Sequence, residues 1–369
     1  MSEKIDLLIN ASILSDRNTG LGIYTYQLLE NIVPELQSRN ISFEIMCKEK
    51  EYLPSNCRNY FHKVEFKGFA SRLIKTSLEY KNKYKLVWST TQHGAIFSRT
   101  KQIVTVHDIT PILYPQGRWH QLVYYRAALP ILIKRCTSVF TVSEATKDDL
   151  VKKYNVNPQK IFVGYESFTR KKLKNNSLEE SLGYGLEKEK YFVIIGIHFE
   201  YKNLHSIINT YAKFKELQKY KVVIIGNDNC SYAEFLKKLI SENNLNDSFI
   251  FTGFIDSNEK NLLIKNAIAC VFPSLYEGFG LPILESMNMG VPVACSNVSS
   301  LPEVGGEAAV YFDPTNIDDI GKTLLNITSN NFDRGSVIKK GFENIERFNW
   351  NEISKKIADE VEEIIGNFN

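Results

Sequence analysis

Two glutamates eight residues apart, Glu277 and Glu285, stand in the stretch best suited to ligand chemistry, PSLYEGFGLPILESM at positions 273–287. The stretch follows an apolar run, and Gly278 and Gly280 let the backbone approach a ligand closely. The proline that follows suits the first turn of a helix, whose free N–H groups bind phosphate well. An isolated pair of glutamates is usually a pair of surface acids, but this surrounding pattern predicts a site for phosphate and sugar hydroxyls.

His107 is the second candidate, because it ends an apolar run in VTVHDITP at positions 104–111. An imidazole there can hold a sugar hydroxyl or move charge near neutral pH. The alternative is a structural histidine whose ring bonds a neighbouring carbonyl, and the local pattern leaves both interpretations open. Asp108 is expected to shape the turn.

Two further motifs suit phosphate binding. Gly20 and Gly22, in NTGLGIY at positions 18–24, predict a tight turn whose backbone amides face a ligand, although such a pair often serves turn geometry alone. Lys202, in GIHFEYKNL at positions 196–204, can neutralise a diphosphate as a point charge. A solvated lysine at a helix start is the alternative.

Short apolar runs alternate with helix-length amphipathic segments along the chain, which predicts a doubly wound α/β protein with buried parallel strands. The expected strands are 5–10, 86–89, 103–106, 139–142, 160–163, 191–196, 221–226, 249–252, 267–272, 291–295 and 309–312. Helices are expected over 23–36, 204–217 and 232–243, and from 317 onward with breaks near 330 and 350.

The alternation stops in a polar stretch and then restarts, which predicts two Rossmann-like domains that face each other. Ligands of such sheets bind at the carboxyl ends of the strands, so the expected site is the interdomain cleft. Neither half has GxGxxG after its first strand, which argues against a nicotinamide-dependent oxidoreductase. The expected parts are an acceptor-side domain at 1–170, a linker at 171–190, a nucleotide-sugar-binding domain at 191–350, and a C-terminal helix at 351–369 that can pack back on the first domain.

The composition excludes several classes of protein. The 369 residues are 43% hydrophobic and 24% charged, which excludes disorder and collagen, and no apolar run is long enough to span a membrane. Six cysteines without CxxC spacing argue against zinc and disulfides, so we expect reduced thiols in a cytoplasmic protein. The net charge of +3 is too small to indicate a nucleic-acid partner.

The charge is divided unevenly along the chain. Residues 1–170 carry 24 Lys/Arg against 15 Asp/Glu, whereas residues 171–369 carry 21 against 27. The asymmetry indicates that the first half meets an anionic surface or ligand, a solvated lysine-rich surface being the alternative. The segment 63–85 contributes most to it, with seven Lys/Arg against Glu65 and Glu79, and predicts peripheral contact with an anionic membrane.

At positions 273–287 the sequence resembles the retaining glycosyltransferases of the GT-B architecture, family 4 type, and the resemblance continues to Asp313 through GVPVACS at 290–296 and LPEVGGEAA at 301–309. It implies that Glu277 contacts the donor sugar, that Glu285 binds the nucleotide ribose, and that His107 hydrogen-bonds the donor sugar. Lys202 would neutralise the donor diphosphate. The other donor-binding positions that it implies are Gly20, Gly22, Gly253, Phe254, Ser274, Phe279, Gly280 and Leu281.

The sequence departs from the family pattern at four places. Ile23 stands where a residue such as arginine follows the second glycine, Ile197 stands where arginine often follows Gly196, and Tyr201 replaces a common arginine. Phosphate-binding cations are therefore missing from these positions. After the expected strand 160–163 the family shows an Asn-Gly turn, but this chain has GYESF, so no residue is assigned a role there.

The resemblance implies a retaining, metal-independent hexosyltransferase that uses a nucleotide sugar and no cofactor. GDP-mannose is the favoured donor, because VHDITPILYP is similar to bacterial mannosyltransferases of surface polysaccharide and O-antigen synthesis; GDP-fucose, dTDP-rhamnose and UDP-sugars stay open. The expected acceptor is a growing, lipid-linked glycan at the inner face of the cytoplasmic membrane. The alternatives are a catalytically weak partner subunit, suggested by Tyr201 and Ile197, and a nucleotide-sugar epimerase of the same architecture.

Overall fold

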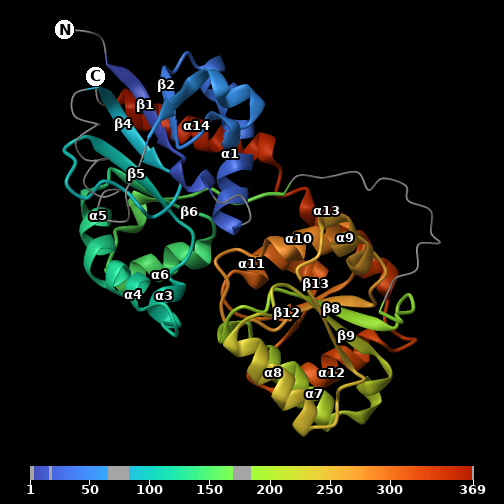
Figure 1. The fold of residues 1–369 in the computed structure, drawn as a ribbon. Helices are drawn as coiled ribbons and strands as arrows, with labels where there is room; N and C mark the ends of the chain where they lie inside the picture. Colours follow the sequence, from blue (N-terminus) through green and yellow to red (C-terminus); the bar gives the residue numbers. More distant parts are fainter. Residues whose placement is uncertain (1–3, 16–18, 65–82, 169–183, 368–369) are drawn as a thin grey trace. The chain divides into compact units, whose positions relative to one another are not determined.

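A computed structural model (Figure 1) describes residues 4–15, 19–64, 83–168 and 184–367. They divide into two compact units, one made of residues 1–169 and 348–369 and the other of residues 170–347. Each unit contains one parallel β-sheet with helices on its faces. Most of the basic segment 63–85 and part of the expected linker lie outside the described residues.

The first unit is built on a seven-stranded sheet in the order β3-β2-β1-β4-β5-β6-β7, and every neighbouring pair is parallel. The strands are β1 (Ile5–Asn10), β2 (Phe43–Cys47), β3 (Phe61–Lys63), β4 (Tyr84–Ser89), β5 (Lys101–Val106), β6 (Ser138–Thr141) and β7 (Ile161–Val163). The prediction missed β2 and β3. A glutamate interrupts the apolar run of β2, and β3 has only three residues, so neither shows the pattern of a buried strand.

Helices of the first unit described by the structure are α1 (Gly20–Ser38), α3 (Thr110–Leu113), α4 (Trp119–Val123), α5 (Leu129–Arg135), α6 (Glu144–Tyr154) and α14 (Trp350–Gly366). The predicted tight turn at Gly20 and Gly22 is wrong, because both glycines lie in the first turn of α1. Thr19 caps this helix: its hydroxyl accepts a hydrogen bond from the Gly22 N–H at 3.2 Å, and its carbonyl accepts one from the Ile23 N–H at 3.0 Å.

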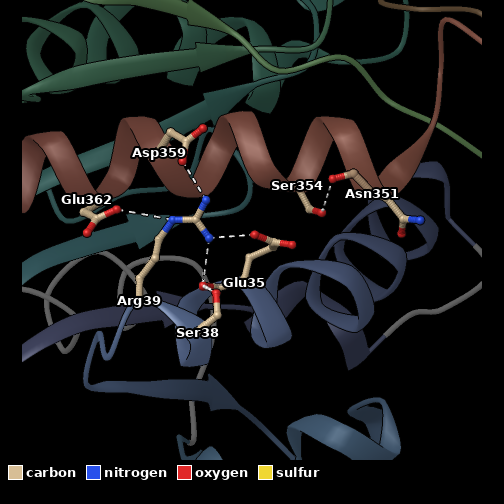
Figure 2. Close-up of polar contacts among 7 residues, drawn as sticks. All are labelled: Glu35, Ser38, Arg39, Asn351, Ser354, Asp359 and Glu362. Atoms are coloured by element: carbon tan, nitrogen blue, oxygen red, sulfur yellow. Dashed lines mark hydrogen bonds and ion pairs between the residues drawn. The ribbon is translucent and has the colours of Figure 1, made fainter.

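The C-terminal helix α14 packs on α1 and belongs to the first unit. Its buried stripe includes Ile357 and Val361, both fully enclosed. At its solvent edge, Arg39 at the end of α1 contacts Asp359 at 2.6 Å and Glu362 at 3.3 Å, while also bonding Glu35 one turn back (Figure 2). Segments more than 300 residues apart in the sequence therefore form one layer of this unit.

The second unit is built on a six-stranded parallel sheet in the order β10-β9-β8-β11-β12-β13. The strands are β8 (Tyr191–Ile195), β9 (Lys221–Ile225), β10 (Phe249–Gly253), β11 (Ala269–Phe272), β12 (Val293–Ser296) and β13 (Ala309–Phe312). The helices are α7 (Leu204–Lys213), α8 (Ser231–Glu242), α9 (Ser257–Lys265), α10 (Leu281–Asn288), α11 (Leu301–Gly305), α12 (Ile317–Ile327) and α13 (Arg334–Ile345).

The strand order of the second unit is that of a Rossmann fold, in which the order of successive strands across the sheet reverses between the first and fourth strands. Here those strands are β8 and β11, which pair directly. The buried side chains of β8, β9 and α7 form a continuous core with those of α8 and α12. The predicted doubly wound α/β class is confirmed for both units.

Candidate functional site

The switch point of the second unit brings two separate sequence motifs together. Lys202 follows β8, and Glu277 follows β11, so both lie beyond the carboxyl ends of neighbouring parallel strands. Lys202 Nζ lies 2.7 Å from Glu277 Oε1, and both side chains are partly exposed. A switch point is where open α/β sheets bind ligands, so the fold places this pair at the expected binding position.

Asn203 fixes the segment that carries Lys202. It adopts a left-handed conformation with φ of 59°, and its buried side-chain amide donates to the carbonyl oxygens of Pro273 at 3.0 Å and Pro314 at 2.9 Å. In addition, the Leu275 N–H donates to the Tyr201 carbonyl at 2.8 Å. These bonds tie the loop after β8 to the loop after β11 and so determine where Lys202 meets Glu277.

Three serines hold Glu277 in place. The Ser274 hydroxyl donates to Glu277 Oε1 at 2.6 Å, and the hydroxyls of Ser299 and Ser300 donate to the Glu277 carbonyl at 2.6 and 3.0 Å. The carboxylate therefore accepts from Ser274 and Lys202 through the same oxygen. With its backbone anchored and its side chain partly exposed, Glu277 can accept further hydrogen bonds from a ligand.

The loop then enters α10 through Gly280, whose φ of 113° is a conformation that side chains rarely adopt. Leu281 and the proline after it form the first helical positions, as the sequence predicted. The Phe279 side chain is buried, so a contact of this residue with a ligand would involve its backbone. Backbone groups of Gly280 and Leu281 thus follow Glu277 closely in the sequence and lie at the start of a helix, where anions are favoured.

Glu285 lies further along α10 and is paired with a residue that the sequence analysis did not identify. Lys260 of α9 places its Nζ 2.8 Å from Glu285 Oε2, and both side chains are partly exposed. Lys260 gave no signal in the sequence, because it is one of several lysines on polar helix faces. Its pairing with Glu285 follows only from the packing of α9 beside α10.

Gly253 and Phe254 lie at the carboxyl end of β10, an edge strand of the sheet. Gly253 has a φ of 68°, its carbonyl accepts from the Gly226 N–H at 3.1 Å, and a side chain added to it would approach the Asp228 carboxylate. Phe254 is 82% exposed. An aromatic ring left this far in solvent is available to stack on a planar ligand.

The structure gives a role to two of the residues that depart from the family pattern, Ile197 and Tyr201. Ile197 is buried in the core of the second unit, so its side chain serves packing. The ring of Tyr201 is stacked on Phe199 with centroids 5.7 Å apart, and Lys202 Nζ lies 5.6 Å from the Tyr201 centroid. Lys202 is accordingly the cation of this segment that reaches Glu277.

His107 lies in the first unit, where the ends of three strands converge. Its Nδ1 is 3.0 Å from Glu166 Oε1, its Nε2 is 3.0 Å from the Thr90 carbonyl oxygen, and the Tyr24 ring packs edge-on at 4.5 Å. Burial opposes protonation of His107, but the contacts with Glu166 and Thr90 outweigh it and raise the pKa above the ordinary 6.5. Both neighbours are acceptors, so the protonated ring satisfies both.

Glu166 is the residue that the sequence analysis missed at this position. It follows β7 within GYESF, the segment to which no role was assigned, and it is buried like His107. An acidic residue in a largely apolar segment after a strand is the signal that could have identified it. Gly20 and Gly22 belong to the same unit, and α1 contributes Tyr24 to the histidine's surroundings.

Among the described residues, no group of three or more His, Cys, Asp or Glu side chains is arranged to hold a metal ion. Over the same part of the chain, none of the helices combines the length and the apolar character needed to cross a bilayer. Of the six cysteines, five are buried, and Cys230 is partly exposed.

Similarity to solved structures supports the GT-B fold class. Sucrose-phosphate synthase from Thermosynechococcus elongatus aligns with a TM-score of 0.75 at 17% identity, covering 99% of this chain and 100% of that chain. Anabaena HepE, solved in complex with UDP and glucose, aligns with a TM-score of 0.73 at 15% identity, covering 97% and 100%. Identities this low establish the fold alone.

Sequence comparison establishes the family. Residues 179–344 match the family described as glycosyl transferases group 1, and residues 30–166 match glycosyltransferase family 4. The O-antigen chain mannosyltransferase RfbU of Salmonella typhimurium is 32% identical over 80% of this chain and 76% of its own length. O-antigen chain mannosyltransferase B of Escherichia coli is 26% identical over 68% and 67%. The chain belongs to the group 1, family 4 glycosyltransferases.

Proposed function

We propose that this protein transfers mannose from GDP-mannose to a hydroxyl of a growing, lipid-linked surface polysaccharide, with retention of configuration and without a metal ion. The observation that carries the proposal is the similarity to an O-antigen chain mannosyltransferase over four fifths of the chain. The Lys202–Glu277 pair at the switch point of the second unit supports it. The ammonium can bind the diphosphate of a nucleotide sugar, and the carboxylate can accept hydrogen bonds from the sugar hydroxyls.

The pair has a definite task in this proposal. The ammonium of Lys202 turns from Glu277 to the donor diphosphate and stabilises the negative charge that grows as the glycosidic C–O bond breaks. Glu277 then accepts a hydrogen bond from a mannose hydroxyl, with Ser274 still bound to the carboxylate. The departing diphosphate takes the proton of the attacking acceptor hydroxyl, so no protein nucleophile is required.

GDP release from GDP-mannose, measured with a lipid-linked acceptor, tests the proposal. We expect Lys202→Met to reduce kcat by about 10²–10³-fold, as loss of one stabilising group typically does. Lys238→Met is the matched control, because this exposed lysine of α8 pairs only with the neighbouring Glu242 in the described contacts. Transfer that persists in Lys202→Met at the wild-type rate would contradict the assignment.

The donor base is tested separately by thermal unfolding with GDP, UDP and dTDP. A ligand present at a hundred times its dissociation constant adds about 2.7 kcal/mol to the free energy of unfolding. We expect GDP to stabilise the protein and Glu285→Ala to abolish the effect. If UDP or dTDP stabilised the protein instead, the donor would be a sugar linked to that nucleotide, and the assignment as a glycosyltransferase would still hold.

A further inference from the structure

The carboxyl-terminal edge of the second sheet carries another cluster of side chains near the Lys202–Glu277 pair. Strand β9 pairs with β8 and is followed by Asp228, and β10 pairs with β9 and is followed by Phe254. Neighbouring strands of a sheet lie about 4.8 Å apart, so β10 lies about 10 Å from β8. A ligand bound at the switch point reaches the ends of β9 and β10 if it extends that far along the edge, as a nucleoside diphosphate can.

Asp228 presents one carboxylate oxygen to the end of β10. Its Oδ2 pairs with Nζ of Lys237 on α8 at 2.5 Å, and the same Nζ lies 5.2 Å from the centre of the Phe251 ring. Its Oδ1 faces Gly253, because a Cβ added to that glycine would lie 3.6 Å from this oxygen. Since Gly253 has no side chain, it does not fill the space beside Oδ1.

The carboxylate of Asp228 is an acceptor at neutral pH. The hydrogen bond from Lys237 holds the pKa of Asp228 below its usual value, so the group is ionised and has no proton to donate. The side chain is 29% exposed, so a ligand can reach it from solvent. Phe254, one residue beyond Gly253, exposes a ring that can stack on a flat ligand. A planar group with hydrogen-bond donors along one edge suits this combination.

We propose that Asp228 is a specificity-determining residue that accepts hydrogen bonds from N1–H and the 2-amino group of guanine, with Phe254 stacked on the base. Guanine has these two donors side by side, whereas uracil and thymine place one N–H between two carbonyl oxygens, which an ionised carboxylate repels. Adenine and cytosine place one amino group beside a bare ring nitrogen. The inference rests on the proposed function for the class of ligand, a nucleotide sugar, and gives the reason why its nucleotide is GDP.

Calorimetric titration of the whole protein with four nucleotides tests the proposal: GDP, UDP, inosine diphosphate (IDP) and xanthosine diphosphate (XDP). IDP lacks the 2-amino group of GDP, and XDP carries a carbonyl oxygen in its place. We expect the wild type to bind GDP about 10–100-fold more tightly than IDP, because one hydrogen bond to a charged group is lost. It should bind XDP still more weakly, because the added oxygen faces the carboxylate.

Asp228→Asn should change this order of affinities. The amide can donate to the 2-carbonyl of xanthine and accept from its N1–H, a pairing that the carboxylate does not allow. We expect the affinity for GDP to fall about 10–100-fold and the preference for GDP over IDP to fall below about threefold. The affinity for XDP should rise at least about tenfold, a gain that damage to the fold would not produce.

Three further variants serve as controls. Lys237→Met removes the same ion pair but keeps the carboxylate, so it should retain the preference for GDP over IDP. Asp247→Asn alters an exposed aspartate just before β10, at the opposite end of the strand, and should leave all four affinities unchanged. Phe254→Ala should weaken GDP, IDP and UDP alike, by about 5–100-fold, because stacking does not depend on the edge of the base.

The proposal is overturned if Asp228→Asn keeps the preference for GDP over IDP, or if it gains no affinity for XDP. Tight binding of UDP in place of GDP would overturn both this inference and GDP-mannose as the donor. Mannose transfer measured in parallel separates the two. If GDP binding depends on Asp228 but no mannose is transferred, only the proposed function fails. If mannose is transferred and Asp228→Asn keeps the wild-type order of affinities, only the role of Asp228 fails.

Discussion

At the scale of single residues, the two predicted chemical centres differ in how much of their hydrogen-bonding capacity the protein already uses. Both ring nitrogens of His107 have partners within the first unit, whereas the Lys202–Glu277 pair is partly exposed. A ligand can therefore compete for the pair more readily than for the histidine. His107 lies buried beside Glu166, whose contact raises the pKa of the ring, and its influence on a substrate would depend on its protonation state.

The charge of His107 can be tested through Glu166→Gln. The raised pKa of His107 means that the folded state binds a proton more tightly than the unfolded state, so the stabilisation is complete below pH 6.5 and is lost as the pH rises through the higher folded-state value. In the variant, burial dominates and the pKa of His107 should fall below 6.5.

Urea unfolding and an NMR titration of His107 measure these effects. We expect the variant to be less stable than the wild type by roughly 3 kcal/mol below pH 6.5, a typical value for breaking a buried pair, and the difference to shrink toward higher pH. Glu144→Gln, which affects an exposed i,i+3 pair with Lys147, should change stability by less than about 1 kcal/mol. An unchanged pKa of His107 in Glu166→Gln would contradict the dyad.

At the scale of secondary-structure elements, the loops that follow β8 and β11 form one unit because of Asn203. Asn203→Ala removes two side-chain hydrogen bonds and leaves two carbonyl oxygens to find other partners, at about 1–3 kcal/mol each. It also places a Cβ-bearing residue without a polar side chain at a φ of 59°, which costs a further 1 kcal/mol or so. We expect the variant to lose both stability and affinity for GDP.

Asn203→Gly separates these two causes, since glycine tolerates the left-handed conformation but makes no side-chain bonds. It should be more stable than the alanine variant by about 1 kcal/mol and should bind GDP equally weakly. Chemical denaturation and calorimetric titration with GDP provide both quantities. If the glycine variant bound GDP as the wild type does, the hydrogen bonds of Asn203 would not be what positions Lys202.

Packing and ion pairs contribute unequally to the attachment of α14. Ile357 is fully buried, and its side chain lies close to Gly164 at the end of the β7 segment, so Ile357→Ala should cost about 2–5 kcal/mol. Arg39→Met removes the contacts with Asp359 and Glu362 drawn in Figure 2, and it should cost less than about 1 kcal/mol, because both carboxylates are exposed. Thermal unfolding of the two variants compares them, and a larger loss for Arg39→Met would reverse this ranking.

The elements show where sequence reasoning succeeds. β1 and β13 match their predicted ranges because both are apolar runs bounded by clear breaks. The strand order that joins Lys202 to Glu277 also follows from the predicted fold class. Lys260 could not be predicted, since it lies in another helix and reaches Glu285 through side-chain geometry alone. Glu166 stands out as an acidic residue in its segment, but its pairing with His107, 59 residues away, follows only from the fold.

At the scale of the whole molecule, the two units differ in continuity. The second unit is a single segment of the chain, residues 170–347, whereas the first is assembled from residues 1–169 and 348–369. The chain leaves and re-enters the first unit at one place, where the Ser167 hydroxyl donates to the Phe348 carbonyl at 2.6 Å and the Tyr165 and Phe348 rings pack at 5.6 Å. The first unit therefore requires both segments, and the second requires only its own.

This difference predicts opposite outcomes for two truncated chains. A chain ending at Arg347 lacks α14, with its buried Ile353, Ile357 and Val361, and exposes the side of α1 on which α14 packs. Its first unit should therefore unfold or aggregate. The fragment 170–347 keeps its complete core, the Lys202–Glu277 pair and the Lys260–Glu285 pair, and should fold alone and gain about 2.7 kcal/mol from GDP at a hundred times its dissociation constant. Circular dichroism and thermal unfolding distinguish the two. A fragment that folds but is not stabilised by GDP would show that nucleotide binding requires residues of the first unit.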